Sequence, residues 1–297
     1  MMDVRNRVYC AAVTPMGKNG DIDFGGFEAN LEWYINKGIG GILVCGGTGE
    51  FVSLSTEERL KLAERAGRQI RGQTGFMVGC GAETTNHAIL YAKHAQEMGA
   101  DSILIIASYY FKPSEEELYQ HFKAVAESVS IPVVLYNNPG ACGTDLTPAF
   151  VKRLSEIPNI RFIKEASGDL VRIREIKEFC SPDFGVMCGC DYLAYETFKN
   201  GATGWISITA NALTSESQEI LDCMLRGEEK RAWSLFSRYL PAYTICEKPY
   251  KAVQIIKYMM DRIGCCGGFS RLPRLELSDP EKKFVDDIMK KTGMLEK

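Results

Sequence analysis

Short apolar runs alternate with longer amphipathic segments from about residue 7 to about residue 210. Most of the runs are rich in Val, Ile or Cys, too short for a helix and bounded by Gly, Asn, Pro or Ser, which is typical of parallel strands buried on both faces. We predict eight strands, at residues 8–13, 41–45, 76–80, 102–107, 132–136, 160–164, 185–188 and 204–208.

Helix start signals lie between these runs. Ser55 with Glu58 and Ser114 with Glu117 have the spacing of capping boxes, and Thr147 precedes a proline at the first helical position. Eight strands separated by helices predict an α/β protein with a (β/α)8 TIM barrel, since a doubly wound sheet would need fewer strands or a switch point.

The strand pattern stops after about residue 212, and residues 215–226, 228–240, 250–263 and 280–292 have helical periodicity. The first of these helices completes the barrel. We therefore predict a catalytic barrel domain at residues 1–224 and a C-terminal helical region at residues 225–297, packed against it because no low-complexity linker separates the two.

Composition narrows the function classes. The chain has 297 residues, of which 45% are hydrophobic and 25% charged, as in soluble globular proteins, and its net charge is −3. Scattered basic residues argue against nucleic acid as a partner. No apolar run approaches the ~20 residues of a membrane span, and the N-terminus lacks the apolar stretch of a signal peptide, so we expect a cytoplasmic protein without a membrane partner.

Eleven cysteines could form disulfides, bind metal or pack as thiols. The odd count argues against a disulfide framework, and neither Cys188-Gly189-Cys190 nor Cys265-Cys266 belongs to a two-pair zinc pattern. We expect buried thiols, no metal and no cofactor. His87, His94 and His121 fall in predicted helices, where a packing or surface role is expected.

Lys164 ends the sixth run and is followed by the small, polar turn 165–169. Barrel enzymes keep their chemistry at strand ends, and burial there would lower the pKa of the amine by ~3 units, worth about 4 kcal/mol. A free amine can attack a ketone and form a Schiff base. The local sequence alone favours a lysine that reaches water; two further strand ends change that preference.

The second strand ends in Cys45-Gly46-Gly47-Thr48-Gly49-Glu50. Glycines with positive φ would expose amide donors there and form a nest for a carboxylate or phosphate, with the Thr48 hydroxyl as a further donor. Tyr136 ends the fifth strand, next to Lys164 on the sixth, and its hydroxyl can act as a general acid or base beside that positive group.

These segments, with the Tyr109-Tyr110 pair, Tyr136-Asn137-Asn138-Pro139 and residues 163–169 at strand ends, resemble those of the dihydrodipicolinate synthase and N-acetylneuraminate lyase family. The similarity runs from about residue 8 to residue 268. It implies a (β/α)8 barrel with a helical extension, usually a homotetramer of two tight dimers.

The resemblance also implies the site. Lys164 would form a Schiff base with pyruvate or another 2-oxo acid, Tyr136 would shuttle the proton, and Tyr110 would cross the tight-dimer interface into the neighbouring site. The Thr48 side chain and the backbone of Gly47 and Thr48 would hold the substrate carboxylate. Two further positions, Gly189 and Ile206, would line the pocket.

Two positions depart from the synthase. Ala141 stands where the synthase has the arginine that binds the aldehyde substrate's carboxylate, and alanine cannot replace such a clamp. Gly47 stands where a Thr or Ser hydroxyl links the two tyrosines. The sequence GGTGEF at residues 46–51 resembles that of the sugar-acid dehydratase branch of the family. Trp205, beside Ile206, faces either the cavity or the helices.

We therefore expect a Schiff-base lyase, best fitted by a 2-keto-3-deoxy sugar acid aldolase or dehydratase. Dihydrodipicolinate synthase, N-acetylneuraminate lyase and hydroxypyrroline-carboxylate deaminase activities stay open as alternatives. From other classes, a non-catalytic 2-oxo acid binding protein is an alternative, and a phosphate-binding barrel isomerase ranks last because the loops after strands seven and eight lack a glycine-rich phosphate cradle.

Overall fold

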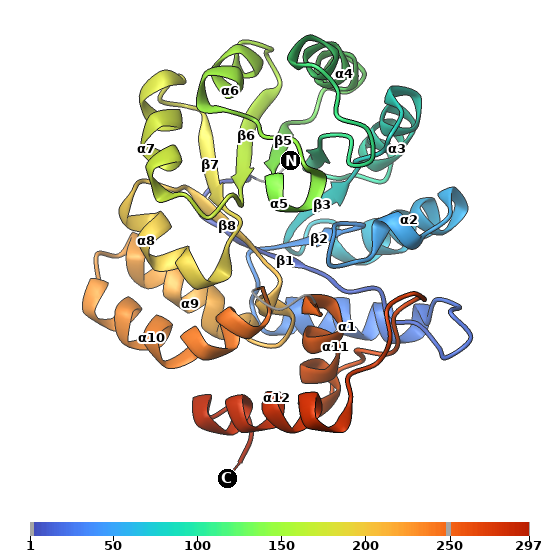
Figure 1. Ribbon diagram of the computed structural model, residues 1–297, viewed down its shortest axis with the longest axis vertical. Coiled ribbons are helices and arrows are strands. Elements are labelled where there is room, and N and C mark those ends of the chain that lie inside the picture. Colours follow the sequence, from blue (N-terminus) through green and yellow to red (C-terminus); the bar gives the residue numbers. More distant parts are fainter. Residues whose placement is uncertain (1–2, 248–250, 297) are drawn as a thin grey trace.

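The computed structural model describes residues 3–247 and 251–296 and contains a closed barrel of parallel strands (Figure 1). Each strand pairs with its sequence neighbours, and β8 closes the barrel against β1. The strands are β1 (Val8–Ala11), β2 (Gly41–Val44), β3 (Gly75–Gly79), β4 (Ser102–Ile106), β5 (Val133–Asn137), β6 (Ile160–Glu165), β7 (Gly185–Cys188) and β8 (Gly204–Ser207). The predicted TIM barrel and all eight predicted strands are confirmed, with ends that differ by at most two residues.

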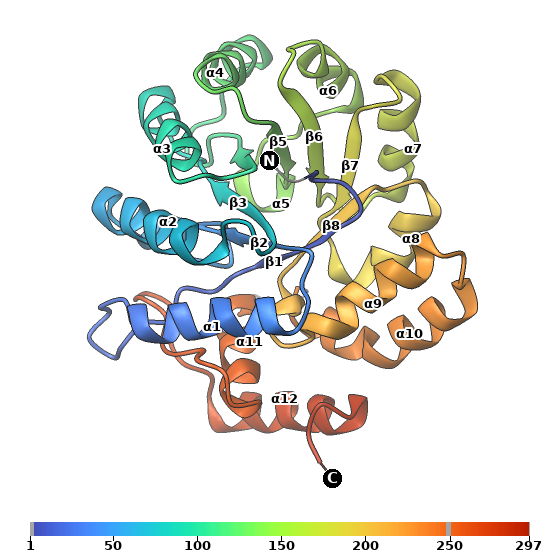
Figure 2. The same ribbon diagram turned by 180° about the vertical axis from the view of Figure 1, so that it is seen from behind.

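Helices connect the strands and surround the barrel (Figures 1 and 2). They are α1 (Phe24–Asn36), α2 (Thr56–Ile70), α3 (Thr85–Glu97), α4 (Glu115–Glu127), the one-turn α5 (Pro139–Cys142), α6 (Pro148–Ser155), α7 (Leu170–Phe179), α8 (Ala194–Lys199) and α9 (Thr214–Leu225). The three predicted start signals are confirmed: Ser55 and Ser114 form capping boxes, and the Thr147 side chain accepts from the Phe150 backbone N–H.

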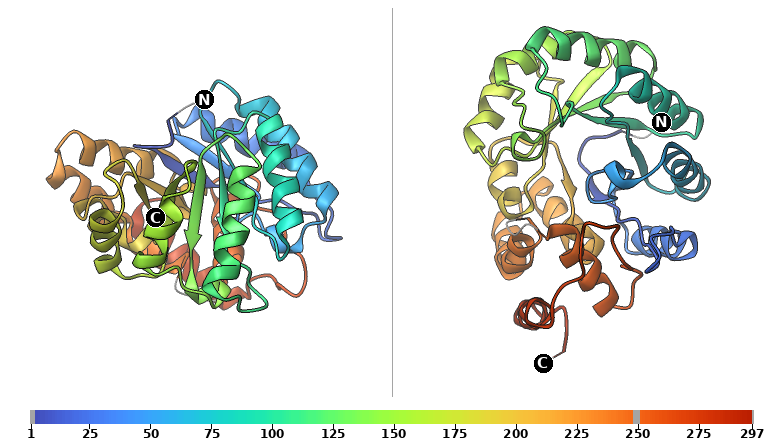
Figure 3. Two further views of the ribbon diagram at one scale, coloured as in Figure 1. Left: turned by 90° about the horizontal axis from the view of Figure 1, so that it is seen from above. Right: turned by 45° about the vertical axis from the view of Figure 1, so that its right-hand side comes forward.

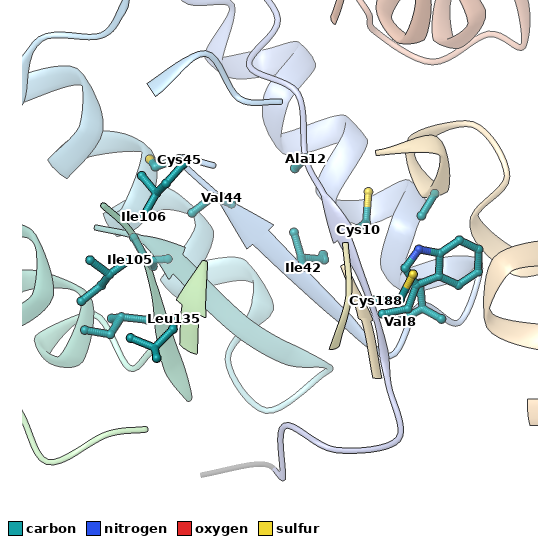
Figure 4. Packing of buried hydrophobic residues seen from close by; sticks show 14 of the residues in the cluster. Val8, Cys10, Ala12, Ile42, Val44, Cys45, Ile105, Ile106, Leu135 and Cys188 are labelled. Carbon is teal, nitrogen blue, oxygen red and sulfur yellow. The ribbon is translucent and has the colours of Figure 1, made fainter. Parts of the chain in front are cut away.

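Side chains alternate between two cores along each strand, because successive strand residues point to opposite faces. Phe162 and Met187 belong to the core inside the barrel, whereas Ile163 and Cys188 pack between strands and helices. Figure 4 shows part of this outer core, in which thiols lie among Val and Ile side chains. All eleven cysteines are free and nine are buried, which confirms the expected packing role.

The C-terminal extension consists of α10 (Glu229–Ile245), α11 (Ala252–Arg262) and α12 (Asp279–Thr292), with α12 outermost (Figures 1 and 3). The predicted helix at 250–263 begins at a residue outside those that the structure describes. Side chains of all three helices join the outer core of the barrel, so the extension is packed against it as expected. The division into two domains at residues 224 and 225 stays a prediction.

A buried ion pair also ties α11 to the barrel. Lys257 Nζ lies 2.6 Å from Glu50 Oε1, and the two side chains are 2% and 0% exposed. The same ammonium donates to the Thr14 and Phe269 carbonyl oxygens at 2.8 and 2.6 Å. Three acceptors therefore satisfy all three N–H donors of a lysine that water does not reach. Within the described residues, no helix has the length and hydropathy of a membrane span.

Candidate active site

A cavity of about 650 Å³ opens at the carboxyl ends of the strands, where barrel enzymes place their sites. Its walls come from the loops after the strands and from the C-terminal extension. Six of the seven predicted site residues line it: Gly47, Thr48, Tyr136, Lys164, Gly189 and Ile206.

Lys164 enters this cavity because of strand periodicity. It lies two residues after Phe162 on β6, so both side chains point inside the barrel, and the lysine stands above the apolar layer. Tyr136 is its register partner on β5. Lys164 Nζ lies 4.3 Å from the centre of the Tyr136 ring, and the lysine is 8% exposed. The Tyr136 hydroxyl accepts a hydrogen bond from Asn138 Nδ2 at 3.0 Å. The predicted convergence of the two side chains is confirmed.

The expected lowering of the pKa of Lys164 is wrong. Burial does act to lower the pKa of the amine, but electrostatic attraction by Tyr136, followed by Glu247 and Asp191, acts against it. Their combined attraction leaves the pKa of Lys164 above its ordinary value. The free protein therefore holds Lys164 as an ammonium, which a base must deprotonate before it can attack a carbonyl.

Glu247, at the end of α10, is the acidic group of the cavity that sequence reasoning missed. Its Oε1 accepts from the Asp191 backbone N–H at 2.8 Å, and it lines the same cavity as Lys164. Burial, followed by the charge of Asp191, raises the pKa of Glu247 well above its ordinary range. A carboxyl group with a perturbed pKa beside a lysine in a cavity is typical of a functional site.

Asp191 directly follows Cys190, which lines the cavity, and is fully buried. Its carboxylate accepts from Trp205 Nε1, the Ser207 hydroxyl and the Thr209 backbone N–H at 2.8 to 2.9 Å. Trp205 is itself fully buried between Phe198 and Tyr243, so it faces the helices rather than the cavity. Asp191 therefore joins β8 to the loop after β7 and fixes the wall that carries Gly189.

The glycine-rich turn after β2 differs from the expectation in its backbone. The left-handed residues are Cys45 and Glu50, with φ of 55° and 59°, and not the glycines between them. Space favours glycine at position 49, since a Cβ there would make a tight contact of 3.1 Å with the Ala12 carbonyl oxygen. No atom lies within 4 Å of the position that a Cβ at Gly47 would take. The absence of a hydroxyl-bearing side chain at this residue therefore leaves open space in the cavity.

Gly189 and Ile206 shape the cavity by size. A Cβ at Gly189 would lie 2.6 Å from the Glu165 carbonyl oxygen, so no larger residue fits there. Ile206 is 1% exposed and contributes an apolar wall from β8. Ala141, in α5, also lines the cavity and brings neither charge nor hydrogen-bonding group from its side chain.

Tyr110 does not enter the cavity of its own chain. It is 79% exposed and stacks edge-on against Phe111, which is 74% exposed. Its neighbour Tyr109 lines the cavity instead and packs edge-on against Phe51. The role of Tyr110 in a neighbouring site stays a prediction.

Cys190 also lines the cavity, but burial raises the pKa of this thiol to about 12, so it is no competing nucleophile. The described residues contain no cluster of His, Cys, Asp or Glu with the geometry of a metal site. Arg274, from the segment between α11 and α12, is a charged lining residue that sequence reasoning also missed. Nothing in the local sequence around Glu247 or Arg274 signals a site, because both reach it only through the packing of the extension.

Comparison with known proteins identifies relatives along almost the whole chain. The model of the dihydrodipicolinate synthetase family matches residues 5–292. A 4-hydroxy-tetrahydrodipicolinate synthase of Stutzerimonas stutzeri (strain A1501) is 35% identical over 285 residues, which cover 96% of this chain and 97% of that protein.

Solved structures agree with this similarity. The chloride-inhibited dihydrodipicolinate synthase of Acinetobacter baumannii, complexed with pyruvate, has a TM-score of 0.92 and 33% identity over 99% of this chain and 100% of the other. YagE of E. coli K12, a prophage protein of the dihydrodipicolinic acid synthase family in complex with pyruvate, has a TM-score of 0.92 and 29% identity, with coverage of 99% and 100%.

Proposed function

Because the chain belongs to the dihydrodipicolinate synthetase family of Schiff-base-forming lyases, we propose that Lys164 is the residue that forms the imine with a 2-oxo acid. The observation that carries this proposal is the placement of a buried amine 4.3 Å from the Tyr136 ring, in a cavity that Thr48 also lines. Pyruvate in two related structures supports a small 2-oxo acid as substrate.

The chemistry follows from these positions. The Thr48 hydroxyl and the backbone of Gly47 and Thr48 hold the 1-carboxylate, which directs the 2-carbonyl carbon towards Lys164. The amine attacks that carbon, and Tyr136 moves protons between the amine and the carbinolamine oxygen as water leaves. The protonated imine then withdraws electrons from C3, which promotes cleavage of the C3–C4 bond or loss of a hydroxyl group from C4.

We further propose that the substrate is a 2-keto-3-deoxy sugar acid, which the enzyme cleaves or dehydrates. Ala141 lines the cavity without the guanidinium that the synthase uses for its aldehyde substrate. Gly47 leaves open space where the synthase and the neuraminate lyase have a hydroxyl group. Both differences favour a substrate that brings its own hydroxyl groups.

Dihydrodipicolinate synthesis is the second candidate, because the curated relatives of 33% to 35% identity are named 4-hydroxy-tetrahydrodipicolinate synthase. N-acetylneuraminate lyase and hydroxypyrroline-carboxylate deaminase activities are further alternatives. A product assay with each substrate, including pyruvate plus aspartate semialdehyde, separates them. Rapid turnover of that last pair would overturn the argument from Ala141.

The imine is tested by borohydride reduction in the presence of pyruvate, followed by peptide mass mapping. We expect a reduced pyruvyl adduct on Lys164 of the wild-type protein. Turnover by Lys164→Ala should fall by a factor on the order of 10⁴ or more, as for other lost nucleophiles. Lys199→Ala, at a surface lysine paired with Glu229, is the matched control and keeps the adduct. A wild-type protein without adduct, together with pyruvate binding by Lys164→Ala, would instead identify a non-catalytic binding protein.

We also propose a cytoplasmic homotetramer built from two tight dimers. The exposed Tyr110 and Phe111 rings support this assembly, because two neighbouring aromatic side chains of this exposure are typical of a surface that a partner covers. In the tetramer, Tyr110 would extend into the site of the adjacent subunit and complete its proton relay. Eleven free thiols agree with a reducing compartment.

A further inference from the structure

Arg274 places a second cation in the cavity. It belongs to the C-terminal extension and to none of the sequence motifs of the barrel. Lys164 and Arg274 are the positively charged side chains among the described lining residues. Arg274 lies between α11 and α12, is 31% exposed and donates through Nη1 to the Ser53 hydroxyl at 3.0 Å. The rest of its planar donor fork is left for another partner.

The charges around Arg274 do not cancel. Glu50 Oε1 is engaged by Lys257 at 2.6 Å, and this buried pair is neutral as a unit. Arg274 Nη1 lies 3.7 Å from the other oxygen, Glu50 Oε2, which accepts no hydrogen bond. Two cations thus face one carboxylate, and one positive charge remains on the side of the cavity.

The neighbouring arginine shows the contrast. Arg271 donates to both carboxylate oxygens of Glu58 and to the Ser53 carbonyl oxygen at 2.6 Å, and it does not line the cavity. Its charge and its donors are satisfied within the protein. Arg274, three residues later, has a hydroxyl group as its hydrogen-bond partner and faces the substrate space.

We propose that Arg274 binds a second carboxylate at the far end of the substrate, so that the enzyme prefers 2-oxo acids with two carboxylates over those with one. This inference rests on the proposed function, which fixes the 1-carboxylate at Thr48 and the 2-carbonyl at Lys164. Ala141 leaves the cavity without an arginine from the barrel, and the extension supplies one instead. Bidentate pairing with a carboxylate suits the guanidinium fork.

The test uses two six-carbon substrates whose far ends differ in charge. 5-Dehydro-4-deoxyglucarate carries a carboxylate there, and 2-dehydro-3-deoxygluconate carries a hydroxymethyl group. We expect wild-type kcat/KM to be higher for the dicarboxylate. Arg274→Met lowers it about 10- to 100-fold for the dicarboxylate, the range of a lost charged hydrogen bond, and changes it less than about 3-fold for the monocarboxylate. Arg274→Lys keeps the charge but not the fork, and gives an intermediate loss.

Arg271→Met is the matched control. It removes an arginine from the same segment, so any general disturbance lowers turnover of both substrates and leaves their ratio unchanged. Equal losses for both substrates in Arg274→Met, or a wild-type enzyme that does not prefer the dicarboxylate, would overturn the inference. Borohydride trapping of pyruvate on Lys164 in the same proteins separates this outcome from failure of the proposed function, since trapping does not require Arg274.

Discussion

Two sides of the cavity are built from different parts of the chain. The barrel side includes Lys164, Tyr136 and Thr48, which lie at or just after strand ends. The extension side includes Glu247, which follows α10, and Arg274, from the segment between α11 and α12. In the proposed mechanism, the barrel side holds the nucleophile and its proton relay, and the extension side contributes charge around them.

The difference lies in how each side is held. Backbone ladders fix the barrel side, since Lys164 is the register partner of Tyr136 on the adjacent strand. Packing and one buried ion pair fix the extension side. Imine chemistry needs the rigid placement of the barrel side. Substrate preference can change through substitutions on the extension side, which move no strand. The comparison predicts that substitutions on the two sides have different signatures.

The largest effect in this comparison is expected on the barrel side. Tyr136→Phe removes the hydroxyl next to Lys164 and lowers kcat by roughly 10²- to 10⁴-fold, the range for a lost general acid or base. Pyruvate still forms an adduct on Lys164, but more slowly, because the amine is retained. Single-turnover rates and borohydride trapping measure the two effects separately.

Tyr109→Phe is the matched control for this prediction, because Tyr109 lines the same cavity but packs against Phe51 rather than Lys164. We expect it to keep kcat within about 3-fold, well below the range for a lost acid or base. If both variants lose activity equally, the proton relay does not depend on the neighbour of Lys164 alone, and the assignment of Tyr136 fails.

The next effect concerns the attachment of the extension side. Lys257→Met removes one partner of a fully buried ion pair and leaves Glu50 with Arg274 at 3.7 Å. We expect a loss of about 3 to 5 kcal/mol in the free energy of unfolding, because a buried charge loses its partner. Urea unfolding monitored by circular dichroism gives the value.

Lys251→Met, at the start of the same helix, serves as the comparison. Lys251 pairs with Glu281 in a partly exposed ion pair, with side chains 37% and 39% exposed, so its loss costs about 1 kcal/mol or less. Equal stability of the two variants would mean that the Glu50–Lys257 pair does not hold the extension.

The same division explains what could be predicted from the sequence. Strands buried on both faces are continuous apolar runs, so their order and the neighbourhood of Tyr136 and Lys164 followed from counting along the chain. Glu247 and Arg274 belong to no such pattern, because helix packing brings them to the cavity and periodicity carries no information on that contact. The left-handed conformation of Cys45 and Glu50, beside three glycines, is likewise set by the turn as a whole.

The direction of the Lys164 pKa shift shows the same limit. Burial alone predicts a lowered pKa, and that effect is present, but it is opposed first by Tyr136 and then by Glu247 and Asp191, which lie far away in the sequence. The local sequence therefore predicted the desolvation of the amine. It did not predict the electrostatic effect of the surrounding groups on the pKa of Lys164. Electrostatics inside a cavity is a property of the folded arrangement.

The smallest effect tests this electrostatic influence directly. Glu247→Gln keeps the size of the side chain and the acceptor for the Asp191 N–H, but removes a negative charge that raises the pKa of Lys164. The pKa of Lys164 should therefore fall. Imine formation needs the neutral amine, so its rate should rise with pH through a midpoint shifted towards lower pH. The pH dependence of borohydride trapping with pyruvate measures the midpoint, and Glu276→Gln, at an exposed residue that does not line the cavity, should leave it in place. A midpoint that stays fixed in Glu247→Gln would show that Tyr136 and Asp191 alone hold the proton on Lys164, and the extension side would then act on the far end of the substrate and not on the imine.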